Sequence, residues 1–73
     1  MNNITVKNII KAINNEVENG LVYVIIESGC HKYNCYEAIY IYDDGNRIAF
    51  YDDYNTRIVL HHKNIDSIKI ADM

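Results

Sequence analysis

The apolar segments after residue 20 follow one another closely, and this limits how they can pair. Parallel strands need a crossover of roughly a dozen residues or more, whereas a tight turn is enough to join antiparallel strands. The chain has 73 residues in all, which leaves no room for a series of such crossovers. We therefore expect antiparallel strands, placed at about residues 21–28, 36–42, 46–51, 56–62 and 66–70.

Turn signals and alternation support these strands. Residues 43–46 (DDGN) and 52–55 (DDYN) are typical of turns, and Gly45 supplies a positive φ at little steric cost. Residues 36–42 (YEAIYIY) alternate as a strand does, which predicts that the tyrosines of this segment share one face. Ile48 and Phe50 alternate in the next strand and are expected to face the core.

An amphipathic helix is expected before the strands, over about residues 5–19. Thr5 is a suitable N-cap and Gly20 a suitable C-terminal cap. The apolar positions follow a period of 3.6 residues and form one stripe. The stripe consists of Val6, Ile9, Ile10, Ile13 and Val17.

These elements predict a single α+β domain over residues 1–73. One architecture that fits is a four- or five-stranded antiparallel meander with the helix packed on it; the other is a small SH3-like or Sm-like barrel. The ending HHKNIDSIKI resembles the close of such barrels. A chain this short has a thin core, and homo-oligomerisation is a common way to stabilise one.

Charge and hydropathy restrict the partners and the compartment. The formal net charge is −3, and the seven basic residues are spread along the chain, which disfavours direct binding of nucleic acid. Paired aspartates instead favour a protein partner with a basic surface. Residues 1–20 are too polar for a signal peptide, and no apolar stretch is long enough for a membrane span. We expect a cytoplasmic protein, either in its own cell or in an infected host.

Cysteines and histidines form the most suggestive set for a metal site. Cys30, Cys35, His61 and His62, with His31 nearby, would satisfy the ligand count of zinc. In a meander, however, the cysteine loop and the histidine pair would lie at opposite ends of the sheet. We therefore expect two free thiols, no metal, no cofactor and no catalytic residue.

Tyrosine is the anomaly of the composition, with seven in 73 residues. Tyrosines bridge core and solvent, but they are also enriched at the centres of protein interfaces. Combined with the aspartate pairs, they predict a partner-binding surface. Its expected residues are Tyr36, Tyr40, Tyr42, Asp43, Asp44, Tyr51, Asp52, Asp53 and Tyr54.

The resulting functional hypothesis is a small acidic, non-enzymatic protein-binding module. Frequent Asn, Ile, Lys and Tyr indicate A/T-rich codons, which suits a phage or mobile element of a low-GC bacterium. Such a protein would inhibit a host nucleic-acid-processing or defence complex, for example of the CRISPR type. Two alternatives stay open: an oligomeric small barrel that binds RNA or a nucleotide, and a zinc- or thiol-dependent protein that uses Cys30, Cys35, His61 and His62.

Overall fold

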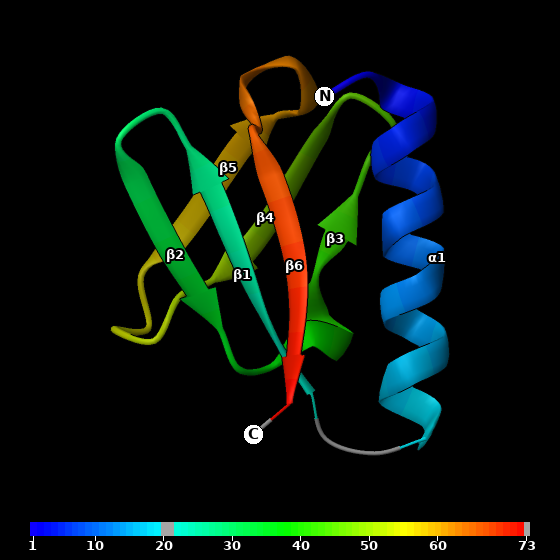
Figure 1. The fold of residues 1–73 in the computed structure, drawn as a ribbon. Helices are drawn as coiled ribbons and strands as arrows, with labels where there is room; N and C mark the ends of the chain where they lie inside the picture. Colours follow the sequence, from blue (N-terminus) through cyan, green and yellow to red (C-terminus); the bar gives the residue numbers. More distant parts are fainter. Residues whose placement is uncertain (20–21, 73) are drawn as a thin grey trace.

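One α-helix, two short 3-10 helices and six strands lie in the described part of the chain, residues 1–19 and 22–72 of a computed structural model. The helix α1 (Asn3–Asn19) comes first (Figure 1). Two short 3-10 helices, η1 (Ala38–Tyr40) and η2 (His62–Asn64), interrupt the strands. The strands are β1 (Val22–Ser28), β2 (His31–Cys35), β3 (Tyr42–Asp43), β4 (Arg47–Tyr51), β5 (Arg57–His61) and β6 (Ser67–Asp72).

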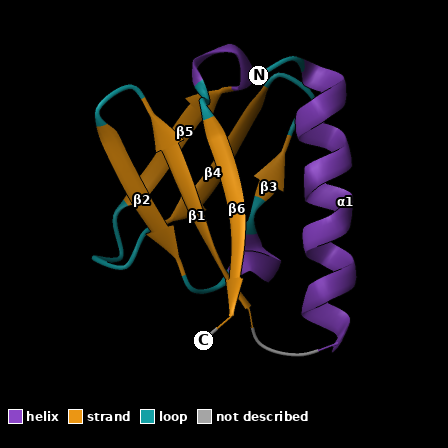
Figure 2. Ribbon diagram, in the orientation of Figure 1, coloured by secondary structure: helices purple, strands orange, loops and turns teal. Residues whose placement is uncertain are grey.

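The strands form two sheets rather than one. Sheet A has the order β2-β1-β6 and sheet B the order β3-β4-β5, and all pairings are antiparallel. In Figures 1 and 2, β4 and β5 cross behind β1 and β2, and α1 stands beside β6 and β3. The predicted α+β fold with antiparallel strands is confirmed. Sheet B is a meander, whereas sheet A joins the first strand to the last.

The core lies where the two sheets face each other. Val24 and Ile26 of β1 are fully buried in one cluster with Ile48 and Phe50 of β4, which confirms the inward orientation expected for β4. Tyr33 of β2 packs edge-on against the Phe50 ring, with 5.9 Å between ring centroids. The side chains of both sheets therefore share one apolar interior.

The helix stripe is confirmed, but the cap is not the one expected. Val6 and Ile13 are buried, and the other three residues of the stripe pack against the core. Thr5 lies inside the first turn, where its N–H donates to Oδ1 of Asn2 at 2.7 Å. Asn2 is thus the N-cap. The expected cap Gly20 lies outside the described residues.

The strand expected at residues 36–42 is wrong. Strand β1 pairs instead with β2, which lies between the strands expected at residues 21–28 and 36–42, where no strand was predicted. The chain then leaves sheet A, turns through η1 and enters sheet B at β3. Alternation would place Ala38 on the same face as Tyr40 and Tyr42. Ala38 is buried, whereas both tyrosines are exposed, so these residues do not share one face of a strand.

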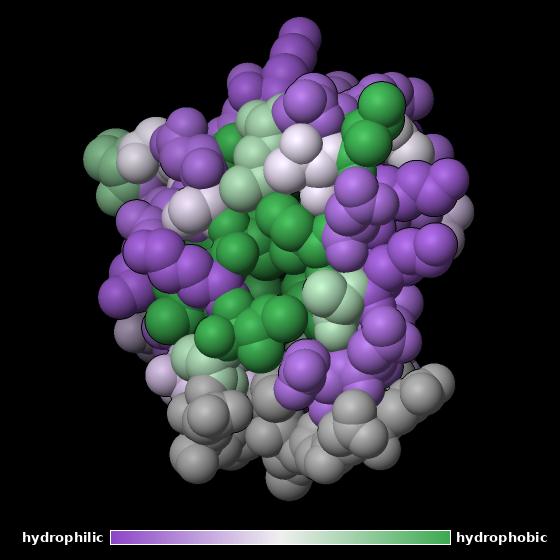
Figure 3. Space-filling view, turned by 45° about the vertical axis from the view of Figure 1, so that its right-hand side comes forward, coloured by the Kyte–Doolittle hydropathy of each residue, from purple (hydrophilic) through white to green (hydrophobic). Residues whose placement is uncertain are grey.

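An apolar area remains at the surface between α1 and β6, shown in green in the middle of Figure 3. Half-buried Ile9 and Ile68 and exposed Ile70 belong to these two elements.

No helix in the described ranges is long and apolar enough to cross a membrane.

Candidate functional site

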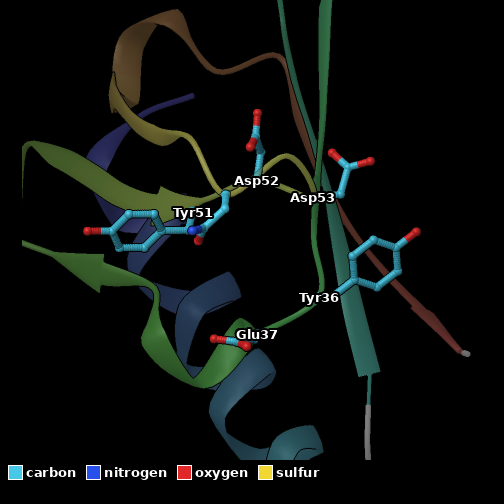
Figure 4. Close-up of a pocket in the computed structure, with 6 residues that line it drawn as sticks. Tyr36, Glu37, Tyr51, Asp52 and Asp53 are labelled. Carbon is cyan, nitrogen blue, oxygen red and sulfur yellow. The ribbon is translucent and has the colours of Figure 1, made fainter.

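A shallow cleft of about 240 Å³ lies where the ends of the two sheets meet (Figure 4). One wall comes from the segment after β2, and the other from the end of β4 and the turn that follows it. We call this cleft the acidic cleft, because three of its six lining residues are carboxylates. It is lined by Tyr36, Glu37, Tyr51, Asp52, Asp53 and Asn55.

The turn after β4 is held in shape by Asp52. Its Oδ1 accepts hydrogen bonds from the backbone N–H groups of Tyr54 at 3.0 Å and Thr56 at 2.8 Å. Its backbone also bonds to Thr56 and Asn55, and Asn55 adopts a left-handed φ of 61°. Asp52 therefore acts as an internal scaffold that fixes where its neighbour Asp53 projects.

The negative charge that is free to meet a ligand comes from Glu37 and Asp53. Neither carboxylate has a hydrogen-bond or ion-pair partner among the described residues. Figure 4 shows Asp53 on the same side of the cleft as the ring of Tyr36, and the ring of Tyr51 on the other side. The cleft is thus lined by two free carboxylates and by two half-exposed tyrosines, one on each side.

The ring of Tyr36 is held by a second tyrosine. Tyr23 of β1 lies against it with 5.1 Å between ring centroids and a tilt of 32°. An aromatic ring that is already ordered loses little conformational freedom on binding, which favours its use as an anchor. Sheet A therefore contributes to the cleft in two ways: the segment after β2 forms one wall, and Tyr23 of β1 supports the ring of Tyr36.

The remaining predicted site residues lie elsewhere. Tyr40, Tyr42 and Tyr54 are strongly exposed but do not line the acidic cleft. Asp43 points inward, where its Oδ1 lies 2.8 Å from Nε2 of the buried His62. Asp44 shapes the β3–β4 turn, and hydrogen bonds from the backbone N–H groups of Asn46 and Arg47 lower the pKa of its carboxyl.

Cysteine and histidine side chains do not form the suspected zinc site. Within residues 1–19 and 22–72, no three His, Cys, Asp or Glu side chains are grouped to hold a metal ion. Both thiols are free; Cys30 is exposed, and Cys35 is buried, so that desolvation raises the pKa of its thiol. His62 is buried too, and its ring bonds to Asn3 and Asp43.

The topological reason expected for this separation was wrong. Ser28 and Gly29, in the turn before Cys30, hydrogen-bond to Asn64 and Asp66 beyond the histidine pair. The Cys30 turn and η2 therefore lie at the same end of the molecule (Figure 1). Cys35 is at the far end of β2, and the ring of His62 is already bonded by its neighbours.

Two residues important to the cleft were missed in the sequence. Alternation along the strand predicted at residues 36–42 would place Glu37 on the opposite face from Tyr36, and only the bend before η1 brings both to one opening. Tyr23 lies in a continuous apolar run, where nothing distinguishes a residue that anchors another ring. The acidic pair at residues 52–53 was predicted from the sequence as part of a site, and both residues line the cleft.

Comparison with protein-family models, with curated proteins and with solved structures gives no match for the chain.

Proposed function

We propose that the protein is a non-enzymatic binding module whose acidic cleft accepts a basic segment of a partner protein. The observation that supports this most directly is the pairing of free carboxylates with exposed tyrosine rings in one opening. A lysine or arginine side chain would meet Asp53 and Glu37 by charge and a tyrosine face by a cation–π contact. Tyrosine is also among the residues that contribute most at interface centres.

The biological setting belongs to the same proposal. An A/T-rich codon signature and a small acidic chain suit a phage or mobile-element protein that works in a bacterial cytoplasm. Nucleic-acid-processing and defence complexes bind nucleic acid through basic grooves, which an acidic protein can block. Inhibition of such a complex is the activity that we propose.

A small SH3-like or Sm-like barrel is the finer description of the fold that we propose. Pairing of β1 with β6 supports it, as does the meander β3-β4-β5 with η2 before the last strand. Packing of Tyr33 on Phe50 brings the two sheets together as halves of one core.

The cleft is tested by comparing baits in a pull-down from a low-GC bacterial lysate. Wild-type protein should retain a basic partner, and the double variant Tyr36→Ala/Asp53→Lys should lose it. The matched control is Glu16→Lys, which reverses a charge on an exposed position of α1. With the purified partner, Asp53→Lys alone should weaken binding by about fivefold to tenfold.

Two results would contradict this proposal. One is capture of the same proteins by wild type and by the cleft variant. The other is an equal loss with Glu16→Lys, because that would show a dependence on overall charge rather than on the acidic cleft.

A further inference from the structure

The outer face of sheet B carries a second surface of opposite character. Side chains alternate along each strand, and directly paired residues share a face. Because Ile48 and Phe50 are buried, the outward positions of β4 and its partners follow from the register. These outward residues are Tyr42 in β3, Arg47, Ala49 and Tyr51 in β4, and Arg57, Val59 and His61 in β5.

The centre of this face is hollow. Ala49 lies between Tyr42 and Val59 in one cross-strand row, and its small side chain leaves a depression of about 140 Å³. Tyr42 is 65% exposed and Val59 48% exposed, so the edge strands β3 and β5 each present a large side chain to solvent beside Ala49 of the central strand. An apolar floor beside an exposed ring offers a flat surface to another ring.

Two arginines line this hollow together with one acidic residue, Asp44, which lies in the β3–β4 turn; no outward residue of the three strands themselves is acidic. Arg57 has no ion-pair partner among the described residues, and it lies directly across from Tyr51. Arg47 pairs with His61 in the sheet, while its Nε donates to Asp44 at 3.1 Å in the adjacent turn. The guanidinium groups of Arg47 and Arg57, from adjacent strands, are thus placed on one face.

We propose that this face binds a single-stranded nucleic acid. A base would stack on the ring of Tyr42 above the Ala49–Val59 floor, and the guanidinium groups of Arg57 and Arg47 would meet the flanking phosphates. Open sheet faces with aromatic rings and arginines recognise unpaired bases in this way, because every base offers a π-face. An acidic protein segment would use the same charges but would make no use of an exposed ring beside a flat floor.

Net charge sets the conditions of the test. The chain carries a formal net charge of −3, so binding is expected at low ionic strength and is measured as a function of salt. The probes are fluorescein-labelled oligothymidylate and oligouridylate of about 12 nucleotides, within the usual site size of one small domain. Anisotropy of either probe should rise with protein, and two phosphate contacts predict a salt slope of about −1.4.

Variants separate stacking from charge. Tyr42→Ala should weaken binding by about fivefold or more, whereas Tyr42→Phe keeps the ring and should bind nearly as wild type does. Arg57→Ala should reduce the magnitude of the salt slope by about 0.7. Lys11→Ala, on an exposed position of α1, removes the same charge elsewhere and should leave both affinity and slope unchanged. These positions are exposed, and far-UV circular dichroism checks that each variant folds.

Three results would overturn the proposal. The first is that neither probe binds at low salt. The second is that Lys11→Ala weakens binding as much as Arg57→Ala does. The third is that a glutamate-rich peptide binds with this dependence on Tyr42 and Arg57 while both oligonucleotides do not. None of these variants alters Glu37, Asp53 or Tyr36, so failure here is distinguishable from failure of the acidic cleft.

Discussion

His62 is the one fully buried polar side chain in the described part of the chain, and it links three elements. Its Nδ1 lies 2.8 Å from Oδ1 of Asn3 at the start of α1, and its Nε2 lies 2.8 Å from Oδ1 of Asp43 in β3. The amide of Asn3 also donates to Asn46 at 3.2 Å. A polar network anchored on a buried ring fixes the relative positions of its members.

Replacing this ring is expected to be costly. His62→Ala leaves a cavity and removes a hydrogen-bond partner from both Asn3 and Asp43, so the free energy of unfolding should fall by about 2 to 4 kcal/mol. Urea denaturation of the variant and wild type measures the difference. The adjacent exposed residue gives the control, since His61→Ala should change it by less than about 0.5 kcal/mol. Equal effects of the two substitutions would rule out the special role of His62.

At the scale of elements, two residues are candidates for the N-cap of α1, Asn2 and Thr5. The side chain of Asn2 accepts the N–H of Thr5, and its carbonyl accepts the N–H of Val6 at 3.2 Å. Asn2→Ala should therefore lower the free energy of unfolding by about 1 kcal/mol. Thr5→Ala should have almost no effect, because the hydroxyl of Thr5 caps nothing. Thermal unfolding followed by circular dichroism distinguishes these outcomes, and the reverse order would restore Thr5 as the cap.

Elements with a strong local pattern were predicted correctly, and those decided by pairing were not. The α1 stripe and strands β4 and β5 have clear periods and turn residues such as Gly45, whose φ is 95°. Residues 36–42 also alternate, yet β1 finds its partners in β2 and β6. Residues 31–35 (HKYNC) have little apolar pattern, since only Tyr33 and Cys35 turn to the core side. Their strand is specified by contact with β1, which no local pattern shows.

The same distinction applies to the candidate site. Asp52, Asp53, Tyr51 and Tyr36 were predicted from composition, and the fold brings these four together. These residues line one cleft because the chain crosses from sheet A to sheet B directly after Tyr36. The outer face of sheet B could not be predicted from the sequence for the same reason. Arg47 and Arg57 line one hollow only because of the register between β4 and β5.

At the scale of the whole molecule, carboxylates at the ends of both sheets make stability depend on acidity. Hydrogen bonds from Lys69 and Ser67 of β6 lower the pKa of Glu27 in β1 below its ordinary value of 4.5. Backbone hydrogen bonds in the β3–β4 turn likewise lower the pKa of Asp44 below its ordinary value of 3.8. A lowered pKa means that the stabilisation is complete above the ordinary value and is lost as the pH falls through the lowered one.

Glu27→Gln tests this dependence. The variant should melt at a lower temperature than wild type at pH 7, and the two melting temperatures should converge as the pH falls to about 3. Glu16→Gln removes the same charge from α1, where the described residues provide no such partners, and should show no such convergence. A pH-independent gap for Glu27→Gln would contradict the assignment.

Pairing of β1 with β6 has a consequence for how the chain acquires its fold. Val22 is aligned with Asp72, and Glu27 with Ser67, so sheet A is completed by residues 67–72 after a loop of most of the chain has closed. Contacts between such distant residues slow folding, because the loop entropy is lost before the pairing compensates for it. Sheet B can form earlier, from adjacent hairpins. During synthesis, β1 must therefore remain without its second neighbour until the last strand emerges, and this interval is when the apolar run of residues 22–26 is most open to aggregation or to a chaperone.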